Sequence, residues 1–196
     1  MSKEQIQAIG NFLLYYHDDL NYIKMFHDFK ENRISFENYC EKATGTFYSF
    51  LIEYKIIRNI IKESTPKLLE KTYDWVHSSQ DDNVDGFAKM LSQTELTRGN
   101  TLTSLASKIL FLNNPWTILP VDTITRRVFG QRENNHSIYM KNVANYRKEN
   151  KAMIEECLLY TKPLTVLIES DFKGKINDLK TIRENRIFDK LLLTTR

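Results

Sequence analysis

Apolar residues recur along this chain at three- and four-residue spacing, which places their side chains on one face of an α-helix. This spacing predicts helical segments over residues 6–20, 47–61, 154–158, 164–168 and 182–192. Pro163 is expected near a helix start, because proline lacks the N–H that a helix interior needs. No pair of alternating apolar runs flanks an Asn-Gly or Asp-Gly turn, so β-hairpins find little support.

The spacing of helix breakers indicates the fold class. Only six glycines and four prolines interrupt the chain, which predicts an all-α multi-helix bundle of about eight to ten helices. Polar stretches at residues 78–86 and 131–137 are expected as surface loops. We expect one domain over residues 1–196, which the first loop could divide into lobes of residues 1–85 and 86–196. Six aromatic residues are predicted core: Phe12, Tyr15, Tyr16, Tyr22, Phe26 and Phe29.

Composition narrows the class of protein. The chain has 196 residues, of which 41% are hydrophobic and 27% charged, as in ordinary globular proteins. No apolar run approaches the roughly 18 residues that cross a bilayer, and residues 1–5 do not resemble a signal peptide. The two cysteines and four histidines lack the spacing of a disulfide framework or a metal site. These features predict a cytoplasmic protein with no cofactor, no metal and no membrane partner.

The positive charge is concentrated in the middle of the chain. Residues 98–151 hold nine Lys/Arg against three Asp/Glu, whereas residues 1–97 hold 11 against 15. The net charge of the whole chain is only +3. A basic segment of this kind is typical of a surface that faces phosphates, although a solvated helical face gives the same count.

The basic segment begins with a turn and a helix. Gly99 allows a tight turn, and the hydroxyl of Thr101 or Thr103 could cap the helix that follows. Apolar positions over residues 102–110 form one stripe, and Asn113-Asn114-Pro115 is expected to end the helix.

A short connector then leads to a second helix. Residues 118–121 read as a buried link, and Asp122 or Thr123 could cap the helix that bears Arg126 and Arg127. An aspartate at such a place is often only a structural cap, and these arginines could be solvated or paired with acids.

Val121-Asp122-Thr123 followed by Arg127-Val128, after a glycine turn and a helix containing Ala106, resembles the helix–hairpin–helix (HhH-GPD) DNA glycosylase superfamily. The endonuclease-III-like branch is the most similar, over about 30 residues. Residues 179–192 also resemble bacterial proteins with an oxoguanine-glycosylase fold. The resemblance implies that Asp122 is the catalytic carboxylate at the mouth of a base pocket. Together with the charge it assigns DNA contacts to Arg98, Gly99, Asn100, Thr101, Lys108, Arg126 and Arg127.

Three departures from the family pattern limit the chemistry. The family hairpin usually reads Leu-Pro-Gly-Val-Gly, whereas this chain has residues 98–102 with one glycine. The nucleophilic lysine of bifunctional members would stand at Thr103 or Ser104, and Lys108 lies one turn too late. Members with an iron–sulfur cluster need four cysteines, and the chain has two. Imine-forming lyase chemistry is therefore not expected, while monofunctional hydrolysis remains.

Three functions stay open on this basis. The first is a monofunctional DNA glycosylase, in which Asp122 stabilises an oxocarbenium ion or activates water. The second is a DNA-binding module without catalysis, and the third is a protein-interaction component of a repair or phage-defence system. A glycosylase also needs a wedge and a base pocket, for which four aromatic residues are available: Phe111, Trp116, Phe129 and Tyr139.

Overall fold

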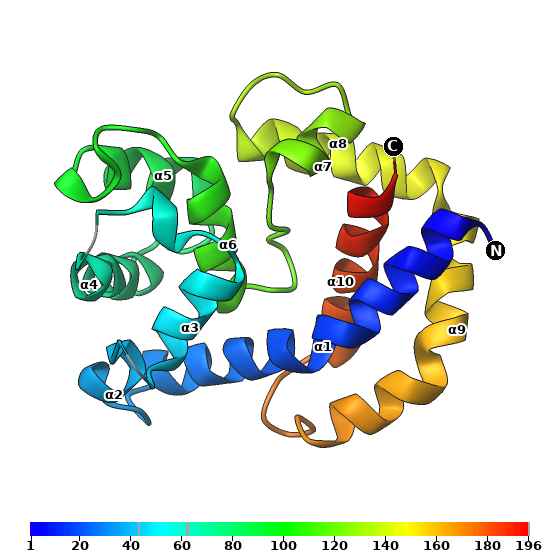
Figure 1. The fold of residues 1–196 in the computed structure, drawn as a ribbon, viewed down its shortest axis with the longest axis horizontal. Coiled ribbons are helices and arrows are strands. Elements are labelled where there is room, and N and C mark those ends of the chain that lie inside the picture. Colours follow the sequence, from blue (N-terminus) through cyan, green and yellow to red (C-terminus); the bar gives the residue numbers. More distant parts are fainter. Residues whose placement is uncertain (43, 62, 196) are drawn as a thin grey trace. The chain divides into compact units, whose positions relative to one another are not determined.

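The computed structural model describes residues 1–42, 44–61 and 63–195 of the chain. Over these residues the protein is helical, with ten α-helices, two short 3-10 helices and no strand (Figure 1). The predicted all-α class and the range of eight to ten helices are confirmed. None of the helices described is both long enough and apolar enough to cross a bilayer.

The helices follow one another with short connections. In chain order they are α1 (Lys3–Lys30), α2 (Phe36–Cys40), α3 (Thr46–Glu53), η1 (Ile57–Asn59), α4 (Thr65–Val76), α5 (Val84–Ser92), η2 (Glu95–Thr97), α6 (Thr103–Asn113), α7 (Thr123–Val128), α8 (His136–Glu149), α9 (Lys151–Ser170) and α10 (Leu179–Thr194).

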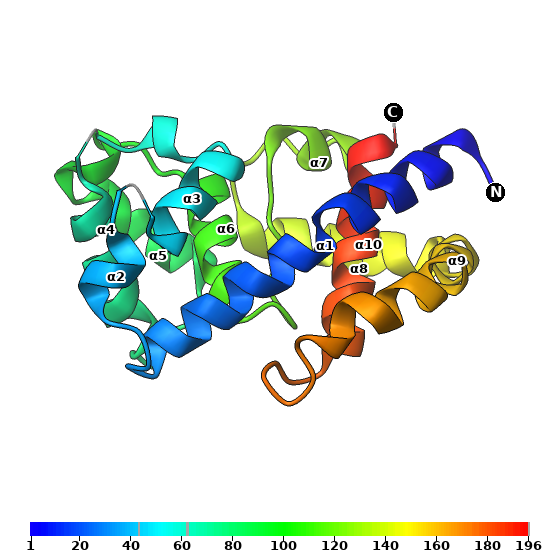
Figure 2. The same ribbon diagram turned by 60° about the horizontal axis from the view of Figure 1, so that its bottom comes forward.

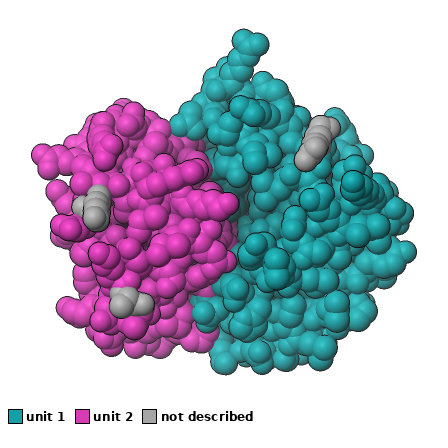
Figure 3. All heavy atoms as spheres, viewed as in Figure 1, with its two compact units in different colours: residues 1–21, 119–196 teal, residues 22–118 magenta. Residues whose placement is uncertain are grey.

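The chain forms two compact units (Figure 3). The first unit consists of residues 1–21 and 119–196, and the second unit of residues 22–118. This division differs from lobes of residues 1–85 and 86–196, because the start of α1 belongs with the C-terminal helices. The polar stretch at residues 78–86 lies inside the second unit, between α4 and α5.

The second unit is organised around α6. Nine of its residues are buried, and α6 packs against α5 and α4. The sequence predicts one apolar stripe on this helix, but Ser107, Phe111 and Leu112 are buried as well. A helix that is buried on almost every side belongs in the centre of its unit.

The first unit is built on α8 and α10. Six buried residues form one of its apolar clusters: Leu119, Val121, Tyr139, Val143, Phe188 and Leu192. The helix α10 packs against both α7 and α9, and Figure 2 shows it passing beside the N-terminal part of α1. This packing brings the connector before α7 close to α10.

The predicted single helix over residues 47–61 is wrong, because α3 ends at Glu53. Lys55 adopts a left-handed conformation with φ of 57°. The Lys55 N–H donates to the Ile52 carbonyl and the Ile56 N–H to the Leu51 carbonyl, both at 2.9 Å. These two bonds form a Schellman motif, which ends the helix although the apolar spacing continues.

The expectation that Pro163 lies near a helix start is also wrong. Pro163 lies inside α9, a helix of 20 residues. Figure 1 shows that the α9 ribbon changes direction along its length. A proline in a helix interior removes one backbone hydrogen bond and bends the helix, which reconciles Pro163 with a continuous helix.

Smaller differences concern the aromatic core and the helix starts. Tyr15 is exposed rather than buried and Tyr22 is half-buried. The buried face of α1 includes only four of the six predicted aromatic residues: Phe12, Tyr16, Phe26 and Phe29. Leu102, not Thr101 or Thr103, occupies the N-cap of α6. The predicted loops over residues 78–86 and 131–137 are shorter, since α5 begins at Val84 and α8 at His136.

Candidate functional site

Asp122 occupies the N-cap of α7. Its Oδ1 atom accepts hydrogen bonds from the backbone N–H groups of Ile124 and Thr125, at 2.8 Å and 3.0 Å. The Asp122 backbone N–H donates in turn to the Thr125 hydroxyl at 3.1 Å, which completes a capping box. Of the two caps that the sequence allows, Asp122 rather than Thr123 is the one formed.

The other carboxylate oxygen of Asp122 is not used by the cap. The side chain is half-buried, and its Oδ2 atom makes no hydrogen bond with any residue that the structure describes. The cap therefore fixes one oxygen against the helix start and leaves the other for water or a ligand.

A buried ionic group lies in the same unit. The Arg186 Nε atom donates to Asp19 Oδ2 at 2.7 Å, and its NH1 atom donates to Asp189 Oδ2 at 3.0 Å. Arg186, Asp19 and Asp189 are almost fully buried, with side chains that are only 2%, 3% and 8% exposed, respectively. Charged groups are buried this deeply only when they are paired, and here one cation faces two carboxyl groups.

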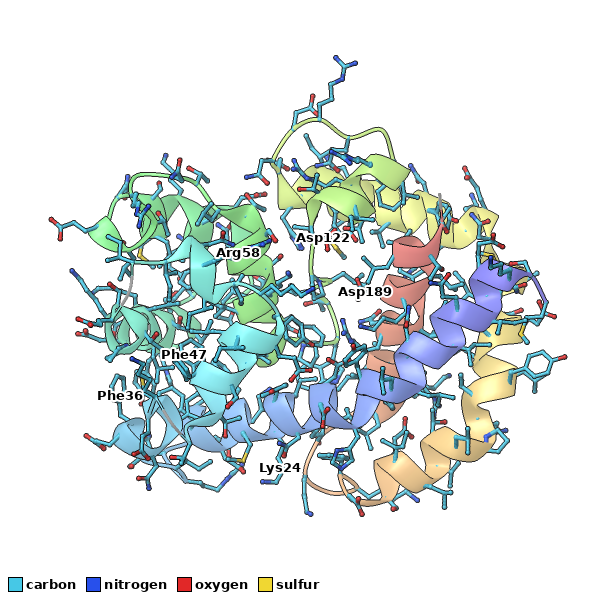
Figure 4. The ribbon with its side chains drawn as sticks, in the orientation of Figure 1. Lys24, Phe36, Phe47, Arg58, Asp122 and Asp189 are labelled. Carbon is cyan, nitrogen blue, oxygen red and sulfur yellow. The ribbon has the colours of Figure 1, made fainter. Side chains whose placement is uncertain are left out.

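Asp122 and Asp189 are electrostatically coupled. Burial raises the pKa of Asp189, and the negative charges of Asp122 and Asp19 raise it further, while Arg186 and Lys190 lower it. Asp122 precedes α7 and Asp189 lies on α10, the two helices that pack together (Figure 4). The two carboxyl groups therefore belong to one site of the first unit.

Tyr139, from α8, completes this group. The side chain is fully buried, and its hydroxyl makes no hydrogen bond of ordinary geometry with the described residues. Burial raises the pKa of Tyr139 well above its usual range, and the charges of Asp189 and Asp122 add to the rise. The nearby Thr125 side chain acts in the opposite direction. A buried hydroxyl without a firm partner is unusual and points to a place where a ligand or water binds.

The two arginines of α7 differ in their surroundings. Arg126 donates from NH1 to the carbonyl oxygens of Arg132 and Glu133, at 3.3 Å and 3.0 Å, so it ties down the loop after α7. Arg127 is exposed. Of the pair predicted to contact DNA, Arg127 has the freer guanidinium for a phosphate.

The rest of the basic segment in the first unit is mostly exposed, with one exception. Arg147 lies over the Phe188 ring at 4.4 Å and donates to Asn185 Oδ1 at 2.6 Å. Burial lowers the pKa of Arg147. Its role is therefore internal, and the exposed cations of this unit's basic segment are Arg127, Arg132, Lys141, Lys148 and Lys151.

The predicted hairpin lies in the second unit, between η2 and α6. Arg98 and Gly99 both have positive φ, at 53° and 75°, and residues 98–101 are exposed. The Asn100 N–H and its side-chain amide both donate to the Thr97 carbonyl, at 3.0 Å and 3.2 Å. The glycine turn expected from the sequence is present, but these two Asn100 donors are already used within it.

The two positions expected for a lysine nucleophile cannot supply an amine for imine formation, because this chain has Thr103 and Ser104 there. Thr103 is buried and Ser104 is half-buried. The half-buried Lys108 donates from Nζ to the Tyr54 carbonyl at 3.0 Å. Its ammonium group is therefore engaged by the protein.

The four aromatic residues considered for a wedge or pocket lie in different settings. Phe111 is fully buried in the second unit, and the half-buried Trp116 lies beside the His27 ring at 5.7 Å. In the first unit the Phe129 ring packs against Tyr139 at 5.6 Å. Of these four residues, Phe129 and Tyr139 lie in the same unit as Asp122.

The sequence analysis did not single out Asp19, Arg186 or Asp189. A signal was present, because Arg186 and Asp189 follow Ile182 at positions four and seven residues later, on the apolar face of α10. Charged residues at such positions must be buried and paired if the helix forms. Pairing with Asp19 joins residues 167 positions apart, which periodicity cannot reveal.

Comparison with known proteins gives no relative from which a role could be transferred: no protein-family model, curated protein or solved structure matches this chain. The arrangement of Asp122, Asp189, Tyr139 and the surrounding cations therefore carries the functional argument.

Proposed function

We propose that this protein is a monofunctional DNA glycosylase, which hydrolyses an N-glycosidic bond with the Asp122 carboxylate. The observation that carries the proposal is the fixed carboxylate of Asp122, with one oxygen held by the start of α7 and the other unbonded. The resemblance of residues 121–128 to the helix–hairpin–helix glycosylase motif supports the same assignment.

The chemistry needs a carboxylate held in this way. Cleavage of the bond between base and sugar builds positive charge on the sugar ring, and a preorganised negative charge beside C1′ stabilises it. The Oδ2 atom of Asp122 can also accept a proton from the attacking water. The target base must first leave the helical stack, at a cost of a few kcal/mol.

The exposed cations supply the contact with the DNA backbone. Arg127 and Arg132 flank the end of α7, and Lys141 and Lys148 lie on α8. In the second unit, Arg98 projects from the turn before α6. Phosphate contacts of this type hold DNA without reading its sequence, and they weaken steeply with salt.

Hydrolysis without an imine intermediate is consistent with the absence of a lysine at the family positions and with the hydrogen bond of Lys108. Lys108 is engaged by the Tyr54 carbonyl, and the two family positions for the nucleophile hold Thr103 and Ser104. An amine that attacks C1′ must be free and close to the sugar.

The proposal is tested by base release from labelled duplexes that each carry one uracil, hypoxanthine, 8-oxoguanine or ethenoadenine. Asp122→Asn keeps an N-cap and removes the carboxylate, so it should abolish release and leave DNA binding unchanged. Asp178→Asn is the matched control, since Asp178 caps α10 through a bond from the Thr181 N–H at 3.2 Å. Release by the wild type and the control alone supports the role of Asp122, whereas full release by Asp122→Asn overturns it.

DNA binding distinguishes the alternatives. Salt-dependent binding with no release from any duplex would favour a DNA-binding module. No binding at low salt would favour a protein-interaction role. Arg127→Ala should lower the salt dependence of binding by about one unit of slope, while Lys173→Ala, an exposed change on the loop after α9, should leave it unchanged.

A further inference from the structure

The group around Arg186 holds more negative than positive charge. Asp19 and Asp189 both bind this one guanidinium, and Asp122 lies close enough to Asp189 to influence it. Asp19 takes the shorter bond, at 2.7 Å, and its side chain is only 3% exposed. Arg186 binds both carboxyl groups and Lys190 also acts on Asp189, so two cations face the three carboxyl groups of Asp19, Asp122 and Asp189. Ionisation of all three carboxyl groups is therefore unfavourable.

Asp189 has few hydrogen bonds that would stabilise a negative charge. Within the described residues it accepts a single hydrogen bond, from Arg186 at 3.0 Å, and only on Oδ2. An ionised carboxylate usually accepts several bonds, whereas a protonated one needs fewer acceptor partners and offers a donor. The direction of the Asp189 pKa, raised mainly by burial, agrees with this count of bonds and charges.

The groups that face Asp189 come from four helices or their starts. They are Asp19 of α1, Asp122 before α7, Tyr139 of α8, and Arg186 and Lys190 of α10. From α9, Glu169 is bonded instead to Arg183, at 3.0 Å, and to the Tyr16 hydroxyl, at 2.8 Å. The buried Tyr139 hydroxyl, which makes no hydrogen bond of ordinary geometry with the described residues, is an independent sign that this place receives a ligand or water.

We propose that Asp189 carries a proton at neutral pH and serves as the general acid that works with the Asp122 carboxylate. This inference rests on the proposed glycosylase function. In the reaction, the oxygen of water bonds to C1′ of the sugar, and the C1′–N bond breaks with its electron pair moving to the base. Asp122 takes a proton from the water, and Asp189 gives its proton to the departing base. Transfer of one proton from Asp122 back to Asp189 restores the starting state.

Two carboxyl groups of this kind divide the work because their surroundings differ. Asp122 is half-buried and bound by two backbone N–H groups, whereas Asp189 is almost fully buried and faces other acids. Pairs of acids in unlike surroundings are a recurrent way to obtain one acid and one base at the same pH.

The proton on Asp189 is tested first by stability, without any substrate. Unfolding of wild type, Asp189→Asn and the exposed control Asp171→Asn is measured against pH. If the native state keeps the proton, the unfolding equilibrium constant of wild type relative to Asp189→Asn rises with pH. The rise is up to about tenfold per unit above pH ~4, where the unfolded chain ionises. A ratio that is flat or falls over this range overturns the proposal.

Asp189→Asn should fold, because its amide oxygen can still accept the Arg186 bond. If it does not fold, infrared spectroscopy of the wild type decides the protonation state. The carbonyl band of a protonated carboxyl group at neutral pH supports the proposal, and the absence of this band overturns it.

The acid role is tested by base release over a pH series. Asp189→Asn should release base about 100- to 10,000-fold more slowly than wild type, and it should lose the decline that wild type shows as Asp189 ionises. Asp171→Asn should match wild type. Release by Asp189→Asn with the wild-type rate and pH profile overturns the acid role and leaves the proposed function standing. If wild type releases no base, the proposed function and the acid role both fail, and the stability series still decides whether Asp189 holds a proton.

Discussion

The capping role of Asp122 and its proposed catalytic role can be separated by substitution. Its side chain satisfies two backbone N–H groups at the start of α7, a helix of only six residues. Asp122→Ala removes both bonds and the capping box, whereas Asp122→Asn and Asp122→Ser keep an oxygen that can accept them. Only the carboxylate charge is lost in the latter two variants.

The expected loss of stability in Asp122→Ala follows from measured N-cap replacements. Loss of an aspartate cap costs about 1 kcal/mol, within a range of roughly 0.5–2 kcal/mol, and Asn or Ser at the cap costs little. For a chain of this length, about 1 kcal/mol corresponds to a shift of roughly 2–4 °C in Tm. We therefore expect the Tm of Asp122→Ala to fall by about this amount below the Tm values of Asp122→Asn and Asp122→Ser.

The assay is urea or thermal unfolding of wild type and the three variants, followed by the base-release measurement that tests the proposed function. The Asn and Ser variants should be nearly as stable as wild type and inactive. Equal stability of Asp122→Ala and wild type would refute the capping geometry. Equal destabilisation of all three variants would show that the charge, and not the hydrogen bonds, stabilises α7.

Three further predictions concern the second unit. Lys55→Gly should raise the free energy of unfolding by about 0.5–1 kcal/mol in urea titrations, because Lys55 has φ of 57° at the end of α3 and glycine adopts this conformation without strain. A loss of stability would contradict this reasoning. Burial lowers the pKa of His27, so the free energy of unfolding should fall as the pH drops below ~6.5, where the unfolded chain gains a proton first. His27→Gln should remove this part of the pH dependence, and an unchanged profile would contradict the role of His27. Burial raises the pKa of the Cys40 thiol to about 11, so little of it is thiolate at pH 8. Iodoacetamide should therefore modify Cys40 far more slowly in the native protein than in the urea-unfolded protein at this pH. Equal rates would contradict the burial of Cys40.

The position of Asp122 shows how far local sequence reaches. The sequence predicts a helix after the connector that is capped by Asp122 or Thr123, because a cap involves neighbours only a few residues apart. The structure shows that Asp122 is the cap. The turn at Gly99 and the end of α6 at Asn113 are predicted in the same way, and the structure confirms both. The end of α3 is not predicted, because a lysine in the sequence does not indicate a left-handed conformation such as Lys55 adopts.

Local sequence is enough to predict that this protein is helical, to locate α1, α6, α7 and α10, and to limit the cap of α7 to Asp122 or Thr123. Periodicity and capping act over a few residues, so a single chain segment contains the whole signal. Long-range packing brings Asp19, Arg186 and Asp189 together in the interior, places Tyr139 near them, and divides α1 between the two units. Such contacts depend on how distant segments pack, and no spacing along the chain encodes the partner of a buried charge.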